Sequence, residues 1–192
     1  MTALPTDWLF PPPGGWTLAD IDRLPEGCRV EVLDGALIVN PSPLPIHQRI
    51  ARRLAQALEP QLTDAWQLEL DIDVLLAEEP LDYVAPDLVV FDSALPLVTR
   101  PIPHLSVLLV VEVVSRSSRR EDRGAKPLAY AEAGIPYFWR VESPESGARS
   151  LTVHTFELAG RTEGYRATGE HRGSLRTRLD APVEIDLRTL VR

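Results

Sequence analysis

Two carboxylates stand where an apolar strand least tolerates a charge. Asp87 follows Pro86 at the start of the apolar run Leu88–Phe91, and Glu112 interrupts the run Val107–Val114. A carboxylate in such surroundings loses favourable hydration unless a cation compensates it, so we expect a metal ion or a basic partner. Two carboxylates on adjacent strands can share one Mg²⁺, which prefers oxygen ligands and keeps waters for chemistry. The pattern therefore predicts a site for Mg²⁺, or for Mn²⁺ in its place.

The candidate basic partner is Lys126, fourteen residues after Glu112. It is the only lysine in the chain, because the other nineteen basic residues are arginine. Lysine offers a compact ammonium whose pKa the surroundings can tune, which arginine does not. Two interpretations stay open from these residues alone: Lys126 serves the acids, or it is a chance surface residue.

The basic residues do not by themselves indicate nucleic-acid binding. The net charge of -8 disfavours a protein that coats DNA nonspecifically through many phosphate contacts. A nucleic-acid role would need local basic patches. A single patch of this kind is more commonly a solvated face of a surface segment. The candidates are one patch of Arg116, Arg119, Arg120 and Arg123 and another of Arg49, Arg52 and Arg53.

Length and composition are those of one globular domain. The chain has 192 residues, of which 44% are hydrophobic and 25% charged. We expect an extended arm at residues 1–15, which contain a Pro-Pro-Pro-Gly-Gly stretch, and a single domain at residues 16–192. The N-terminus lacks the pattern of an export signal, no apolar run is long enough to cross a membrane, and Cys28 is the only cysteine. These features favour the cytoplasm and no membrane partner.

The elements that must position the acids follow from periodicity. Thr17 is a candidate cap for a short helix. Asp34-Gly35 joins two alternating segments as a tight hairpin turn, because both residues tolerate a positive φ. The remaining predictions are a long helix over residues 46–62, a strand over 66–76, two buried strands at 88–91 and 107–111, a helix over 119–133 ending at Gly134, a strand to Val141, a hairpin from 151 to about 165, and a last strand at 183–185.

This order of elements predicts an α/β (α+β) fold, a mixed β-sheet flanked by helices. One feature complicates the placement of Lys126, because Pro127 follows it directly. Proline disfavours a helical conformation in the preceding residue and donates no hydrogen bond. The helix could therefore begin near Lys126, which would turn its ammonium away from the acids.

Several motifs together resemble a known family. In chain order they are Arg29-Val-Glu-Val-Leu-Asp-Gly35, Pro41-Ser-Pro with His47-Gln48, Pro86-Asp87-Leu-Val-Val90, Val111-Glu112-Val-Val-Ser115, Asp122-Arg-Gly-Ala-Lys126, and Tyr130-Ala-Glu-Ala-Gly134-Ile-Pro with Trp139. They resemble the Uma-two family of putative restriction endonucleases, within the PD-(D/E)XK, or restriction-endonuclease-like, superfamily. The match spans Trp16 to Val191.

The resemblance implies a role for five residues. Asp87 and Glu112 resemble the two metal-binding acids, and Lys126 resembles the lysine, displaced onto the next helix because Val114 stands at its standard position. Glu31 resembles an additional acid near the metal, although a Glu between two valines of an edge strand could simply face solvent. His47 resembles the family histidine, although a His in a first helical turn is often a surface residue.

The function implied is an endonuclease that uses Mg²⁺ (or Mn²⁺) to hydrolyse phosphodiester bonds in nucleic acid, with DNA the expected substrate. In this hypothesis Arg116, Arg119, Arg120 and Arg123 grip the flanking phosphates. A homodimer is expected, because two symmetric sites cut two strands most simply. Two alternatives remain open: a catalytically degenerate dimer on the same fold that acts as a binding or scaffold module, and a hydrolase of small phosphoesters.

Overall fold

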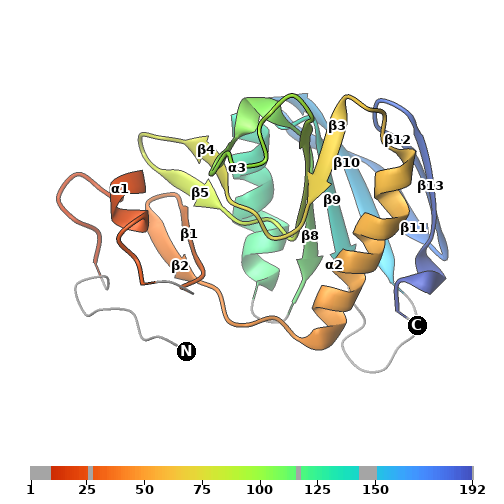
Figure 1. Ribbon diagram of the computed structural model, residues 1–192, viewed down its shortest axis with the longest axis horizontal. Coiled ribbons are helices and arrows are strands. Elements are labelled where there is room, and N and C mark those ends of the chain that lie inside the picture. The colour runs from red at the N-terminus through yellow and green to blue at the C-terminus, as the bar shows by residue number, and fades with distance from the viewer. Residues whose placement is uncertain (1–9, 26–27, 116–117, 143–150, 192) are drawn as a thin grey trace.

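The chain folds into two mixed β-sheets, a separate hairpin and three α-helices within the residues described here (Figure 1). The computed structural model describes residues 10–25, 28–115, 118–142 and 151–191. The helices are α1 (Leu18–Ile21), α2 (Pro45–Leu58) and α3 (Lys126–Ala133). None of them has the length and apolar character needed to cross a membrane.

The larger sheet carries the two acids. Its strand order is β11-β10-β9-β8-β6-β3, antiparallel except for the parallel pair β8 and β9. Both of the apolar runs predicted as buried strands lie inside this sheet, so that prediction is confirmed. Its strands are β3 (Trp66–Glu69), β6 (Leu88–Asp92), β8 (Val107–Val114), β9 (Tyr137–Glu142), β10 (Thr152–Gly160) and β11 (Gly164–Arg172).

The smaller sheet is built on the predicted hairpin. Asp34 and Gly35 have φ values of 50° and 71°, as a tight turn requires. The strand order is β2-β1-β5-β4-β7, and a further hairpin, β12 with β13, stands apart from both sheets. The strands are β1 (Val30–Leu33), β2 (Ala36–Val39), β4 (Val74–Ala77), β5 (Asp82–Val84), β7 (Ile102–Pro103), β12 (Ser174–Arg178) and β13 (Pro182–Asp186).

Helices α2 and α3 cover opposite faces of the larger sheet (Figure 1). Alternate side chains of a strand point to opposite faces. On β8, Leu109, Val111 and Val113 therefore pack in one core with α2 and the β12–β13 hairpin. Val110 points the other way, into a second core formed by α3 and the smaller sheet. Side chains of α3 and of both sheets therefore pack together in this second core.

Helix boundaries follow the predicted signals closely. Thr17 caps α1 in a capping box with Asp20. Helix α2 begins with Pro45 at its first turn, and a 3₁₀ turn at Glu59–Gln61 extends it. Helix α3 ends at Gly134, which adopts the left-handed conformation with φ 85°.

The predicted single strand over residues 66–76 is wrong. It is two strands, β3 in the larger sheet and β4 in the smaller sheet. The chain turns between them at Asp71, whose φ is 58°, a conformation in which a strand does not continue. The fold is nevertheless of the predicted mixed α+β class, although it has two sheets where one was expected.

The predicted division into an arm and one domain stays a prediction. Residues 1–9 of the arm lie outside the described residues. The buried hydrophobic residues form one core against α2 and another against α3, and both cores include side chains of strands β6 and β8. A single domain is consistent with cores that share strands in this way.

Candidate active site

Strand β8 places Glu112 on the α3 side of the larger sheet. Glu112 is two residues after Val110, so both side chains leave the same face of the strand. Val110 packs in the core that includes α3, and Glu112 is only 2% exposed. The carboxylate therefore lies beneath α3 and needs partners from that helix.

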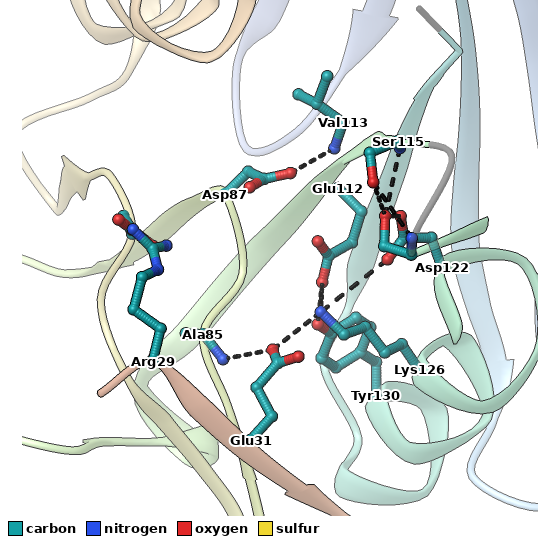
Figure 2. A network of polar contacts seen from close by, with 12 residues as sticks. Arg29, Glu31, Ala85, Asp87, Glu112, Val113, Ser115, Asp122, Lys126 and Tyr130 are labelled. Atoms are coloured by element: carbon teal, nitrogen blue, oxygen red, sulfur yellow. Dashed lines mark hydrogen bonds and ion pairs between the residues drawn. The ribbon is translucent and has the colours of Figure 1, made fainter. Parts of the chain in front are cut away.

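Lys126 and Tyr130 are those partners (Figure 2). They lie four residues apart, on one face of α3. Lys126 donates from Nζ to Glu112 Oε1 at 2.9 Å, and the Tyr130 hydroxyl donates to the same oxygen at 2.5 Å. Lys126 is 5% exposed and Tyr130 is fully buried. The interpretation of Lys126 as a chance surface residue is therefore wrong.

A π-helical turn places Lys126 beside the acids although Pro127 follows it. The helical segment runs from Arg119 to Ala133, and its residues Glu121–Ala125 form a π-helix. The backbone N–H of Lys126 donates to Glu121, five residues back. Proline has no N–H to donate, so a turn with this looser hydrogen-bond pattern accommodates Pro127 inside the helix. The ammonium is directed at Glu112 instead of away from it.

Glu31 lies on β1 and contacts the same lysine. Strand β1 is not an edge strand, because β2 and β5 flank it. Glu31 is 1% exposed, and its Oε1 accepts hydrogen bonds from Ala85 N at 2.8 Å and from Lys126 Nζ at 2.8 Å. The alternative that Glu31 faces solvent is therefore wrong.

Asp87 and His47 form the outer part of the cluster. Asp87 precedes β6, the neighbour of β8, and its Oδ2 accepts from Val113 N at 2.6 Å. His47, in the first turn of α2, places Nε2 at 3.2 Å from the same oxygen. The register that pairs Leu88 with Val111 explains why Asp87 and Glu112 come from adjacent strand ends.

Sequence reasoning missed Asp122 and Tyr130. Asp122 is 1% exposed, with Oδ1 at 3.9 Å from Lys126 Nζ, and Ser118 Oγ donates to its Oδ2 at 2.5 Å. A signal for both was present, because Asp122, Lys126 and Tyr130 recur at four-residue steps and so share one helix face. Both residues were named only as parts of motifs and were given no role in the site.

Burial and mutual repulsion perturb the acids of this cluster. Burial raises the pKa of Glu112 well above its ordinary range; Lys126 opposes the shift, and the neighbouring acids add to it. Burial likewise raises the pKa of Asp122 to about 7, against the opposing effects of Lys126 and Ser118. Burial would lower the pKa of Lys126, but the charges of Glu112 and Glu31 outweigh it and raise that pKa.

His47 is perturbed in the direction that favours its charged form. Burial lowers its pKa, but the hydrogen bond and the charge of Asp87 outweigh burial and raise the pKa above its ordinary value. Nδ1 of His47 is buried without a hydrogen-bond partner. A protonated His47 therefore balances part of the charge on Asp87.

One cavity joins these side chains. It has a volume of about 700 Å³ and is lined by all five residues predicted for catalysis, Glu31, His47, Asp87, Glu112 and Lys126. Asp122, Arg119 and Arg123 line it as well. The structure thus brings the predicted residues together from β1, α2, β6, β8 and α3, elements far apart in the sequence.

The donor set of the cavity fits a hard divalent cation. In the described ranges, no three acidic, histidine or cysteine side chains already converge on one point as a multidentate metal site requires. Mg²⁺, however, is commonly held by one or two carboxylates and keeps several waters, which suits Asp87 and Glu112. Negative charge is in excess at the cavity wall, because six carboxylates line it against one lysine and three arginines. Asp122 Oδ1 is also buried without a hydrogen-bond partner.

The predicted arginine patch is only partly gathered at the cavity. Arg119 and Arg123 line it, whereas Arg120 is exposed on the same helical segment and does not. Arg116 lies outside the described residues. Arg123 donates from Nε and Nη2 to Glu142 at 3.0 and 2.7 Å, so its charge is already paired. In the second patch, Arg49 and Arg52 are exposed, and Arg53 donates to a backbone carbonyl of the C-terminal turn.

The fold has a solved counterpart. It is similar to the crystal structure of a putative nuclease belonging to DUF820 from Anabaena variabilis ATCC 29413. The TM-score is 0.61 with 14% sequence identity, over 92% of this chain and 97% of that chain. At this identity the likeness establishes the fold. No curated protein matches the chain in sequence.

A match to a family model gives the class of the protein, which is restriction-endonuclease-like. The model of the Uma2 family, described as "Putative restriction endonuclease", matches residues 18–188. The chain belongs to the Uma2 family. The resemblance drawn from its motifs is thereby confirmed, and membership supports a nuclease.

Proposed function

We propose that this protein is a metal-dependent endonuclease that hydrolyses phosphodiester bonds in nucleic acid, with DNA as its substrate. The observation that supports this best is the burial of Glu112 and Lys126 in one cavity with Asp87. An ion pair that served stability alone would need only one acid beside Lys126. Such a pair would also be a poor means of stabilisation, because replacing a buried ion pair by apolar residues is often neutral or stabilising. An excess of acids at a solvent-accessible cavity is instead what a cation-binding site requires.

Asp87 and Glu112 would hold the cation, Mg²⁺ or Mn²⁺. When bound, the cation lowers the pKa of a water and neutralises charge that develops on the scissile phosphate. Lys126 and Tyr130 both donate to Oε1 of Glu112, which fixes the carboxylate and leaves Oε2 outside that pair of hydrogen bonds. Val113 N fixes Asp87 in the same way through Oδ2. These contacts preorganise both acids before the cation arrives.

Lys126 supplies positive charge on the wall of the cavity. Glu31 and Glu112 hold its ammonium at 2.8 and 2.9 Å, and these charges keep it protonated. A permanently charged ammonium stabilises a pentavalent phosphorane dianion electrostatically, and it is poorly suited to removing a proton from water. Lys126 is therefore assigned to charge stabilisation and to orienting Glu112.

The arginines at the mouth would bind phosphates on either side of the cleaved bond. Arg119 and Arg123 line the cavity, and a guanidinium can contact a phosphate through two parallel hydrogen bonds. Arg123 would have to exchange Glu142 for phosphate, which costs the existing bidentate pair. The protein is proposed to act as a homodimer, which light scattering in solution would test.

A panel of substrates tests the function. Supercoiled plasmid, single-stranded DNA, RNA and bis(p-nitrophenyl) phosphate are each incubated with the protein and Mn²⁺. We expect cleavage of DNA that EDTA abolishes. Hydrolysis of the small diester alone would identify a phosphoesterase, and binding of DNA without cleavage of any substrate would identify a degenerate module, so either result overturns the proposal.

A further inference from the structure

Asp122 is a buried acid with one unsatisfied oxygen. Its side chain is 1% exposed, and Oδ1 is buried without a hydrogen-bond partner. Its other oxygen, Oδ2, accepts from Ser118 Oγ at 2.5 Å. Leaving a buried charged acceptor unpaired costs on the order of 1–3 kcal/mol or more, so such an atom calls for a ligand.

The position of Asp122 is fixed from two sides. Its backbone N–H donates to Ser118 O at 2.8 Å, and Ser118 Oγ lies 2.8 Å from Ser115 Oγ. Ser115 follows directly on strand β8, which carries Glu112. The π-helical turn Glu121–Ala125 then aligns Asp122 with the face of Lys126. Asp122 is therefore held beside Lys126, with Oδ1 turned toward Nζ, and it lines the cavity with the other acids (Figure 2).

Lys126 does not satisfy Asp122. Its Nζ lies 2.8 Å from Glu31 and 2.9 Å from Glu112 but 3.9 Å from Asp122 Oδ1, too far for a hydrogen bond. The ammonium is thus committed to two acids. Glu31 Oε1 is also satisfied twice, by Ala85 N and by Lys126. Among the described acids around the lysine, Asp122 is the one with a buried oxygen that has no hydrogen-bond partner.

The charges point to a dication as the missing partner. Six acids line the cavity and carry six negative charges when ionised, against the four positive charges of Lys126, Arg29, Arg119 and Arg123 and, when it is protonated, that of His47. Arg123 and Glu142 pair with each other, so the acids remain in excess around Lys126. A hard cation prefers carboxylate oxygens, and an anionic phosphate would be repelled from this wall of the cavity.

We propose that Asp122 is a third metal-binding carboxylate of this site, beside Asp87 and Glu112. The three carboxylates do not already converge on one point, so Oδ1 would close onto the cation, directly or through one of its waters, when the cation binds. The inference rests on the proposed function and adds a ligand to it. Asp122 reaches the site from the helix that carries Lys126, whereas the other two acids come from the sheet. The cation therefore ties the π-helical turn to strands β6 and β8.

Metal affinity measured without turnover tests this assignment. Mn²⁺ is titrated calorimetrically into the full chain, into Asp122→Asn, and into Glu132→Gln as a matched control. Glu132→Gln removes the same charge from an exposed residue of α3 that does not line the cavity. We expect Asp122→Asn to weaken Mn²⁺ binding at least about tenfold and Glu132→Gln to change it less than about twofold.

A second variant guards against misfolding of the first. Ser118→Ala keeps the charge of Asp122 but removes the hydrogen bond to Oδ2, so it should weaken binding by a smaller factor. Equal affinities for Asp122→Asn and Glu132→Gln would overturn the role of Asp122 while leaving the proposed function intact. Failure of the wild-type chain to bind Mn²⁺ at all would overturn both.

Discussion

Replacing Lys126 by methionine should unfold the metal-free protein far more easily. The substitution keeps the length of the side chain and removes the charge that contacts Glu31 and Glu112 at 2.8 and 2.9 Å. Both acids are at most 2% exposed, so water does not replace the ammonium. Removing one partner of a buried ion pair costs about 3–5 kcal/mol. For a domain of this size, that loss lowers the melting temperature by roughly 6–20 °C.

Urea unfolding followed by circular dichroism in EDTA measures this loss. Arg120→Met, an exposed cation of the same helical segment, is the matched control and should change the free energy of unfolding by less than about 0.5 kcal/mol. Adding Glu112→Gln to Lys126→Met should recover part of the loss, because one buried charge is then gone. A loss below about 1 kcal/mol in Lys126→Met, the size expected of a surface pair, would refute the reasoning.

Three further predictions address pH, hydrogen bonding and metal. The pKa of Asp122 is about 7 in the folded protein against an ordinary 3.8, so the folded state holds this proton more tightly than the unfolded state. The free energy of unfolding of the metal-free protein should therefore fall as the pH rises from 3.8 to about 7, by at most roughly 4 kcal/mol. Urea unfolding at several pH values should show a smaller fall in this free energy for Asp122→Asn. Tyr130→Phe removes a donor to Glu112 and should cost about 1.5–3 kcal/mol in the same assay, whereas an unchanged free energy would contradict that hydrogen bond. Saturating Mn²⁺ should raise the wild-type melting temperature by roughly 5–10 °C and leave Asp87→Ala unmoved, with exposed Asp64→Ala behaving as wild type.

Local patterns predicted the elements that carry the acids. The Asp34-Gly35 turn, the stripe of α2 and the continuous apolar run of β8 are each encoded in neighbouring residues, so sequence reasoning found them. The break at Asp71 was not found, because the alternation of apolar residues continues through it. Only the pairing of β3 and β4 with different sheets shows the strand to be two, and pairing is a nonlocal property.

Part of the candidate site was likewise predictable from local sequence, and part depends on packing between distant elements. The costly positions of Asp87 and Glu112 are visible in the sequence because each charge interrupts an apolar run. The contacts of Lys126 with Glu31 and Glu112 depend on the packing of α3 against two sheets, which no local pattern encodes. The π-helical turn that accommodates Pro127 also depends on this packing. The helix-breaking tendency of proline therefore suggested that the ammonium of Lys126 points away from the acids, whereas it points toward them.

Nicking of supercoiled plasmid in the presence of Mn²⁺ tests the central claim most directly. Wild type is compared with Glu112→Gln, which keeps the shape of the side chain, and with Glu163→Gln, the same change at an exposed turn. We predict nicking by wild type and by Glu163→Gln, and a rate at least about 100-fold lower for Glu112→Gln. Equal nicking by wild type and Glu112→Gln, or none by wild type, would contradict the assignment of this cavity as a nuclease site.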